Sequence, residues 1–163
     1  MGDDAERLAL IDGRGELDDL FNRSSGDDVL SIYLVRGISA TAGLEGAIGV
    51  AGAILGPPGV DNTVQSGVVV GWETTLGRTD QLGFTMAHES GHYLGLSHTR
   101  ERLAGCTTTM SVECSPWGGV DQIDDTPNPA SQALRYLMYW LAVGNDLISP
   151  TQALVLRRNP LVH

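Results

Sequence analysis

The chain has 163 residues, 42% of them hydrophobic, which is enough for one domain with a buried core. The 20 Asp+Glu against 10 Lys+Arg give a net charge of -10, which argues against nucleic acid or an anionic membrane as a partner and mildly favours basic substrates. No apolar run is long enough to span a bilayer, so we expect no membrane insertion.

The first half of the chain predicts one helix and several strands. Residues 5–22 mix helix formers with Asp and two glycines, which predicts a broken or late-starting helix ending near Phe21. Residues 28–35 alternate two largely apolar sets of side chains, so we expect a central strand there. Residues 66–72 predict a short strand through Val68-Val69-Val70. Strands followed by helices indicate the α+β class.

A glycine-rich segment between residues 37 and 59 is nearly uncharged. Ile48, Val50 and Ile54 fall on one side of an extended segment, with Gly52 between the last two, and a peptide could approach such a backbone closely. The other interpretation is a glycine-rich connector without any role in substrate binding.

The segment from Thr85 to Thr99 carries the clearest chemistry. Thr79-Asp80 predicts an N-cap and an early acid for a helix on which His88 and His92, four residues apart, face the same side. Gly95 can end this helix with a positive φ and turn the chain back, so that His98 becomes a third nitrogen ligand.

Three imidazoles with a fourth position open to water are typical of a catalytic zinc site. Glu89, next to His88, is then the general base for a zinc-activated water. The alternative is a set of surface histidines on an amphipathic helix. That alternative does not explain why three of the four histidines fall within eleven residues.

The full pattern HExxHxxGxxH resembles that of the metzincin clan of zinc metallopeptidases. Leu96-Ser97-His98-Thr99 and the stretch Asp124-Asp125-Thr126-Pro127 are most similar to the pappalysin, or cytophagalysin, group. The resemblance is strong over residues 85–99 and weak over the rest of 65–160. It implies an α+β fold with a mixed twisted sheet, an active-site helix and a smaller irregular C-terminal part that ends in a helix.

The resemblance also assigns two regions outside the zinc motif. It makes residues 46–54 the edge strand that pairs with substrate, with Ile48, Val50, Gly52 and Ile54 as candidate residues. It places Met138 in a tight turn beneath the zinc, although residues 129–143 read as helix by propensity. We favour the turn, since Met110 is too close to the motif and Met86 lies within it.

The chain departs from the group after Met138. The group has tyrosine two residues after the methionine, whereas this chain has Trp140, with Tyr139 in place of an aspartate. Tyr139 supplies a hydroxyl donor for the transition state only if the turn is shifted by one residue, because the indole of Trp140 is a donor without acid function.

The region from 100 to 129 holds two further candidates. A disulfide between Cys106 and Cys114 would close a small loop, with free thiols or zinc ligation as the alternatives. Asp121, Asp124 and Asp125 are crowded oxygen donors that fit calcium, as in the resembling group, or an ordinary solvated turn.

The C-terminal segment predicts a final helix. Ser149-Pro150-Thr151-Gln152 is a capping-box pattern with proline at the first helical position, and Asn159-Pro160 ends the helix. We therefore expect one catalytic domain over 1–163, with an upper part of about 1–95 and a lower part of about 96–163.

The sequence thus predicts a monomeric zinc-dependent endopeptidase acting on a peptide or protein. The alternatives are a degenerate, zinc-stabilised protein-binding module and hydrolysis of a non-peptide amide or cell-wall peptide. The acidic start, Met1-Gly2-Asp3-Asp4, does not resemble a signal peptide. Because secreted zinc peptidases usually carry a leader and an inhibitory pro-segment, we expect these upstream and a secreted protein; the alternative is a cytosolic one.

Overall fold

The fold combines a small mixed sheet with four helices in the part of the chain that the structure describes. This computed structural model describes residues 8–24, 26, 28–39, 44, 47–73, 78–100, 121–127 and 129–162. Its elements are β1 (Leu10–Ile11), α2 (Arg14–Phe21), β2 (Ile32–Val35), β3 (Gly37–Ile38), β4 (Gly49–Ala51), β5 (Val68–Gly71), α3 (Thr79–Tyr93), α4 (Ala130–Ala133) and α5 (Pro150–Arg158). The predicted α+β class is confirmed, as are the helix ending at Phe21 and the strand through the three valines.

The main sheet has the order β2-β5-β4, with β2 parallel and β4 antiparallel to β5. Just beyond β2, the short β3 pairs in parallel with β1. The expectation that residues 28–35 form the central strand was wrong, because β2 is the terminal strand of the three and β5 is central. Val68, Val69 and Val70 of β5 are all 0% exposed, as a strand covered on both faces must be.

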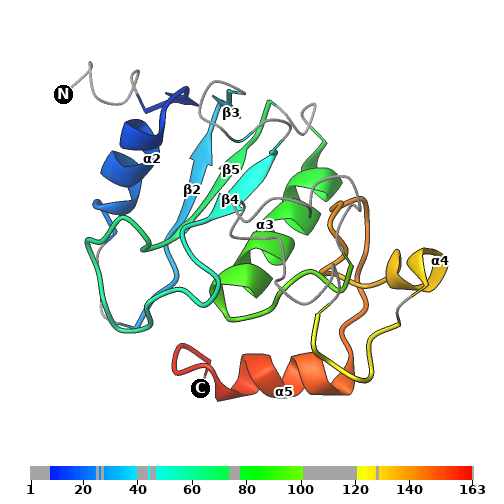
Figure 1. Ribbon diagram of the computed structural model, residues 1–163. Coiled ribbons are helices and arrows are strands. Elements are labelled where there is room, and N and C mark those ends of the chain that lie inside the picture. Colours follow the sequence, from blue (N-terminus) through cyan, green and yellow to red (C-terminus); the bar gives the residue numbers. More distant parts are fainter. Residues whose placement is uncertain are drawn as a thin grey trace.

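Each face of the sheet packs against one helix (Figure 1). On one face α2 forms a hydrophobic cluster with β1, β3 and Val69 of β5, whose buried members are Leu8, Ile11, Leu17, Leu20, Phe21, Val35, Ile38 and Val69. On the other face α3 packs on β4 and β5. There Val68, Val70 and Tyr93 are buried, with Leu82 and Met86 packed against them.

The start of α3 differs from the prediction by one residue. Its N-cap is Arg78, without a side-chain cap bond, and Thr79 is already helical. Asp80 lies in the first turn as predicted, where its charge suits the helix dipole, and it pairs with the Arg78 guanidinium at 2.8 Å.

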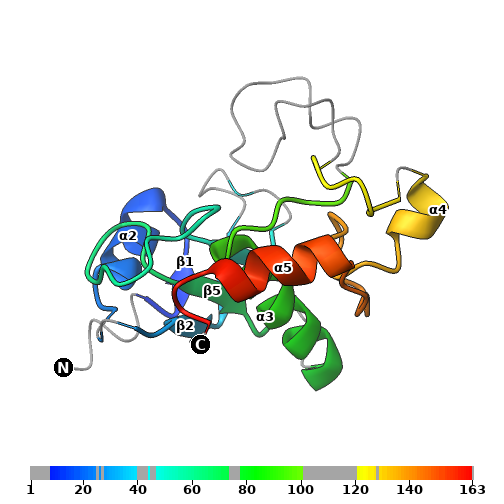
Figure 2. The same ribbon diagram turned by 90° about the horizontal axis from the view of Figure 1, so that it is seen from below.

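The predicted C-terminal helix is confirmed in full. The Ser149 hydroxyl accepts a hydrogen bond from the Gln152 amide at 3.0 Å, Pro150 is the first helical residue, and Asn159 is the C-cap. The Asn159 side chain donates to the Leu94 carbonyl at 3.2 Å, so the end of α5 is fastened to the end of α3. Figures 1 and 2 show α5 running beneath α3. Helix α4 lies toward the N-terminal end of α5, and the sheet and α2 lie toward its C-terminal end.

Among the described residues, no helix is both long and apolar enough to cross a membrane. The division into upper and lower parts near residue 95 stays a prediction.

Candidate metal centre

Helix α3 carries His88 and His92 on one face, one turn apart, as their spacing predicts. The two ring centroids are 4.8 Å apart and nearly perpendicular. The two residues are 4% and 1% exposed, so both imidazoles are buried.

The chain leaves α3 through a glycine turn that returns the third histidine. Gly95 has φ +106°, the Gly95 amide donates to the His92 carbonyl, and the Leu96 amide donates to the Gly91 carbonyl, each at 2.9 Å. This pair of bonds is the Schellman motif that typically ends a helix at a left-handed glycine. The predicted role of Gly95 in redirecting the chain is confirmed.

The three imidazoles meet at their Nε2 atoms. The His98 Nε2 lies 3.1 Å from that of His88 and 3.0 Å from that of His92. Within the described residues, these three histidines form the one group of at least three His, Cys, Asp or Glu that could hold a metal ion. Three nitrogens bound to one tetrahedral zinc at 2.0–2.1 Å would stand about 3.3 Å apart, close to the two separations from the His98 Nε2.

Backbone carbonyls fix the orientation of the two helical rings. Nδ1 of His88 lies 2.7 Å from the Leu137 carbonyl oxygen, and Nδ1 of His92 lies 2.7 Å from that of Leu96. A carbonyl oxygen only accepts, so each Nδ1 carries the proton and donates it, which leaves the lone pair on Nε2. Both lone pairs therefore point to the common centre, and this donor set fits a metal ion.

Burial keeps these rings neutral. Loss of solvation, reinforced by the neighbouring His98 ring, lowers the pKa of His88 to about 4, although the bond to the Leu137 carbonyl raises it. Burial likewise lowers the pKa of His92 well below its ordinary value. At neutral pH both rings are thus in the form that binds a metal.

Met138 lies in a turn, as predicted, and not in a continuation of α4. The Tyr139 amide donates to the Tyr136 carbonyl at 3.0 Å, and Met138 is 0% exposed. A Cβ added to Gly91 would stand 2.5 Å from the Met138 sulfur, so the thioether packs on α3 between the two histidines. The Thr99 amide donates to the Met138 carbonyl at 2.8 Å, which ties this turn to the residue after His98.

Glu89 lies against the edge strand of the sheet. The carboxylate is on the neighbouring face of α3 and the residue is 6% exposed. A Cβ added to Gly49 of β4 would stand 2.7 Å from Glu89 Cγ, 2.8 Å from Thr85 Cγ2 and 3.1 Å from Glu89 Oε1. Only glycine allows the strand to come this close to the carboxylate.

Strand β4, Gly49–Ala51, is shorter than the predicted 46–54. The residues that direct their backbone groups outward are also not the predicted candidates, which were Ile48, Val50, Gly52 and Ile54. The Gly71 amide donates to the Ile48 carbonyl, and the Gly52 amide donates to the Gly67 carbonyl, each at 2.9 Å. Because antiparallel pairing alternates, Ile48, Val50 and Gly52 direct their backbone groups at β5, and Gly49 and Ala51 direct theirs outward. Ile54 lies beyond the strand.

Tyr139 and Trp140 follow the Met138 turn, with ring centroids 5.8 Å apart. Tyr139 pairs with Arg100 through an isolated parallel bridge, and the Trp140 amide donates to the Arg100 carbonyl at 3.3 Å. This places both aromatic residues beside the segment that follows His98. A role for the Tyr139 hydroxyl in catalysis stays a prediction.

Asp125 has a structural role that the sequence did not suggest. Its carboxylate accepts from the Ser149 hydroxyl at 2.6 Å and from the Thr151 amide at 2.9 Å, at the start of α5. The Ser149 bond lowers the pKa of this carboxyl. Asp121 accepts from the Thr126 hydroxyl. Asp121, Asp124 and Asp125 form no candidate metal group in the described part of the chain, so calcium stays a prediction.

Cys106 and Cys114 lie outside the described residues, so the disulfide also stays a prediction. Two features of the site were missed at the level of sequence: the packing of Gly49 on Glu89 and the packing of Met138 on Gly91. The glycine inside the HExxH pattern was a usable signal for the second, because a small residue between two ligands leaves room for another side chain.

Comparison of this chain with protein-family models, with curated proteins and with solved structures gave no match.

Proposed function

We propose that this protein is a zinc-dependent endopeptidase of the metzincin type. The observation that carries the proposal is the convergence of three buried imidazoles next to a buried glutamate, with the Nε2 atom of His98 at 3.0–3.1 Å from those of His88 and His92. A purely structural zinc site would be closed by four protein ligands. The described residues offer three.

His88, His92 and His98 would hold the ion through Nε2. Zinc bound there would supply a Lewis acid that polarises a carbonyl and lowers the pKa of a water molecule. The Leu137 and Leu96 carbonyls keep two of the rings in the tautomer that this requires.

Glu89 would act as the general base and then the general acid. Its carboxylate is one residue from a ligand and does not belong to the three-histidine group, so its role here would be proton transfer and not metal binding. It would take a proton from the attacking water and deliver it to the departing amide nitrogen. The close packing of Gly49 on Glu89 Cγ limits the positions that the carboxylate can adopt.

The outer edge of β4 would hold the substrate extended. Gly49 and Ala51 direct backbone groups away from β5, and a peptide chain can pair with them as an added strand. Gly49 also contacts the side chain of Glu89, so pairing at this edge brings the peptide backbone beside the catalytic carboxylate.

A hollow of about 400 Å³ adjoins the site along α3. It is lined by Ala87, which precedes His88, by Leu137, whose carbonyl holds His88, and by Asp80 and Asp146 among others. A side chain of a bound peptide would fit such a hollow, and its two acidic residues favour a basic one.

The test is cleavage of a mixed peptide library by purified protein, with fragments identified by mass. Untreated protein, protein treated with a zinc chelator, and the Glu89→Gln variant are compared. We expect cutting that the chelator abolishes, that added zinc restores, and that Glu89→Gln lowers by about 10²–10⁴-fold at unchanged zinc content.

Zinc bound at one ion per chain without any cutting would overturn the proposal. It would favour the alternative of a zinc-stabilised binding module. Strong activity in Glu89→Gln would show instead that another group acts as the base.

A further inference from the structure

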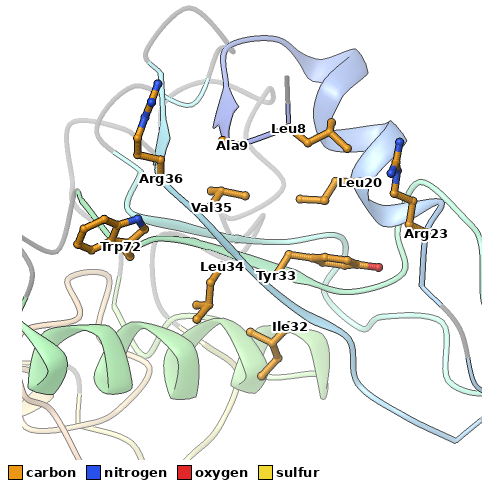
Figure 3. A pocket seen from close by; sticks show the side chains of 10 residues that line it. All are labelled: Leu8, Ala9, Leu20, Arg23, Ile32, Tyr33, Leu34, Val35, Arg36 and Trp72. Carbon is orange, nitrogen blue, oxygen red and sulfur yellow. The ribbon is translucent and has the colours of Figure 1, made fainter. Parts of the chain in front are cut away.

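The edge of the sheet opposite β4 carries a groove that the proposed peptidase function does not use. It has a volume of about 680 Å³ and runs along β2, with Leu8 and Leu20 above the strand and Trp72 beside it. Figure 3 shows Ile32 and Leu34 pointing to one side of β2 and Tyr33 to the other. Leu34 is 56% exposed, Trp72 49% and Ile32 37%, which is unusual for three neighbouring apolar residues.

Backbone groups of β2 face this groove. The Val68 amide donates to the Ser31 carbonyl at 2.9 Å, and the Trp72 amide donates to the Val35 carbonyl at 2.8 Å, so residues 31, 33 and 35 pair with β5. In a parallel ladder the intervening residues, Ile32 and Leu34, direct their N–H and C=O groups to the other side. Among the described residues, the chain before β1 bonds to this edge only at Arg36, whose amide donates to the Ala9 carbonyl.

The groove has an arginine at each end. Figure 3 shows Arg36 at one end and Arg23 at the other, with the apolar residues between them. Arg36 contacts Glu73 only at 3.8 Å, with both side chains about half exposed, so a closer carboxylate can be accepted. In a chain of net charge -10, two arginines bracketing an apolar edge are a local exception.

A second copy of this chain fits the edge poorly. Two β2 strands paired antiparallel about Leu34 would bring Arg36 of one copy towards the Arg23 end of the other. Like charges would then face each other at both ends, in addition to the repulsion between two acidic molecules.

We propose that the β2 edge is a docking site for an extended acidic segment of a partner protein, which adds a strand beside Ile32 and Leu34. The segment has apolar residues in its middle and a carboxylate near each end, one for Arg36 and one for Arg23. From Ile32 to Arg36 a strand advances about 13 Å, which places the two carboxylates about four residues apart. This inference does not depend on the proposed peptidase activity.

The test uses a fluorescent, N-acetylated peptide, Glu-Val-Tyr-Val-Glu, titrated against the Glu89→Gln protein so that no cleavage interferes. Binding is followed by anisotropy. The control peptide has Lys in place of both Glu. We expect saturable binding of the acidic peptide and at least about tenfold weaker binding of the basic one.

Variants assign the binding to this edge. Arg23→Glu with Arg36→Glu is expected to weaken binding at least about tenfold, whereas Arg157→Glu with Arg158→Glu on α5 changes the net charge equally and should change it less than twofold. Leu34→Pro removes the outward N–H without touching the ladder to β5 and should abolish binding, and Leu154→Ser, an exposed apolar control on α5, should not.

Equal effects of the two arginine pairs would overturn the proposal, because they would show a general charge effect or binding at another edge. A concentration-dependent dimer in sedimentation that Leu34→Pro disperses would also overturn it, since the edge would then belong to a second copy. Absence of saturable binding by the acidic peptide would overturn it as well.

Discussion

The two edges of the main sheet differ in what lies next to them. The β4 edge is built from Gly49, Val50 and Ala51 and is backed by α3, whose Glu89 packs directly on Gly49. The β2 edge is built from larger apolar residues, and α3 does not reach far enough to cover Leu34. Small residues let α3 come close to the β4 edge. Large apolar residues remain exposed at the β2 edge, where a partner could bind.

This difference between the edges assigns the proposed catalysis to β4 and the proposed partner docking to β2. Both edges offer two residues with outward backbone groups, Gly49 and Ala51 on one and Ile32 and Leu34 on the other. A peptide at β4 lies beside Glu89, whereas a segment at β2 lies across the sheet from the histidines. Five variants or conditions can break or sharpen this comparison.

The largest effect is expected from the metal centre beside the β4 edge. His98→Ala removes the nitrogen that both other Nε2 atoms approach, so we expect bound zinc to fall below a tenth of one ion per chain and cutting to be lost. Zinc content is measured by elemental analysis after dialysis. His163→Ala serves as the control, since His163 is the one histidine outside the HExxHxxGxxH pattern of the sequence.

A second change tests the close approach at β4. Gly49→Ala places a methyl 2.7 Å from Glu89 Cγ, so the carboxylate must shift, and we expect kcat/KM to fall about 10–100-fold with zinc content unchanged. Gly15→Ala in α2, where an added Cβ meets nothing within 4 Å, is the matched control and should keep full activity. Unchanged activity in Gly49→Ala would contradict the positioning of Glu89 by β4.

Acid should destabilise the metal-free protein through the buried histidines. The pKa of His88 is lowered from about 6.5 to about 4 in the folded protein. Between pH 6.5 and 4, this histidine is therefore protonated in the unfolded chain but neutral in the folded one. Stability is therefore complete above pH 6.5 and falls by about 3 kcal/mol from this residue as the pH drops to 4. Urea unfolding of chelator-treated protein at pH 7.5, 6 and 5 measures it, and a His88→Gln variant should show a flatter dependence.

A smaller effect is expected where α5 is fastened. Ser149→Ala removes the N-cap acceptor for the Gln152 amide and the hydroxyl that donates to Asp125, and we expect a loss of about 1 kcal/mol of unfolding free energy. Ser149→Thr keeps the hydroxyl and should lose less. Zinc content should stay at the wild-type value in both, because α5 does not contribute a ligand.

The smallest effect on catalysis is expected at the β2 edge. Leu34→Lys places a charge on an exposed side chain of the strand at the opposite edge from β4, so kcat/KM for peptide cleavage should change less than twofold. A large loss of activity would show that the two edges are coupled, and the separation between chemistry and docking would then be wrong.

Local patterns in the sequence predicted much of this structure. The four-residue spacing of His88 and His92, the turn at Gly95 and the capping box at Ser149 each depend on residues a few positions apart, so all three were predicted. The position of β2 was wrong because alternation of apolar residues reports burial but not which strand lies beside it. The start of α3 was off by one residue, since cap preferences define helix ends only approximately.

The sequence by itself determined the three histidines that could hold a metal ion, the class of the fold and the helix that presents two of them, because these follow from chemistry and period along a short stretch of chain. Only the tertiary structure decided that the Leu137 carbonyl orients the His88 ring, that Gly49 packs on Glu89, that Asp125 holds α5 and that β2 keeps an open edge. Each of these joins residues separated by 24 or more positions or depends on strand order, and packing between distant segments leaves no periodic signal in the sequence.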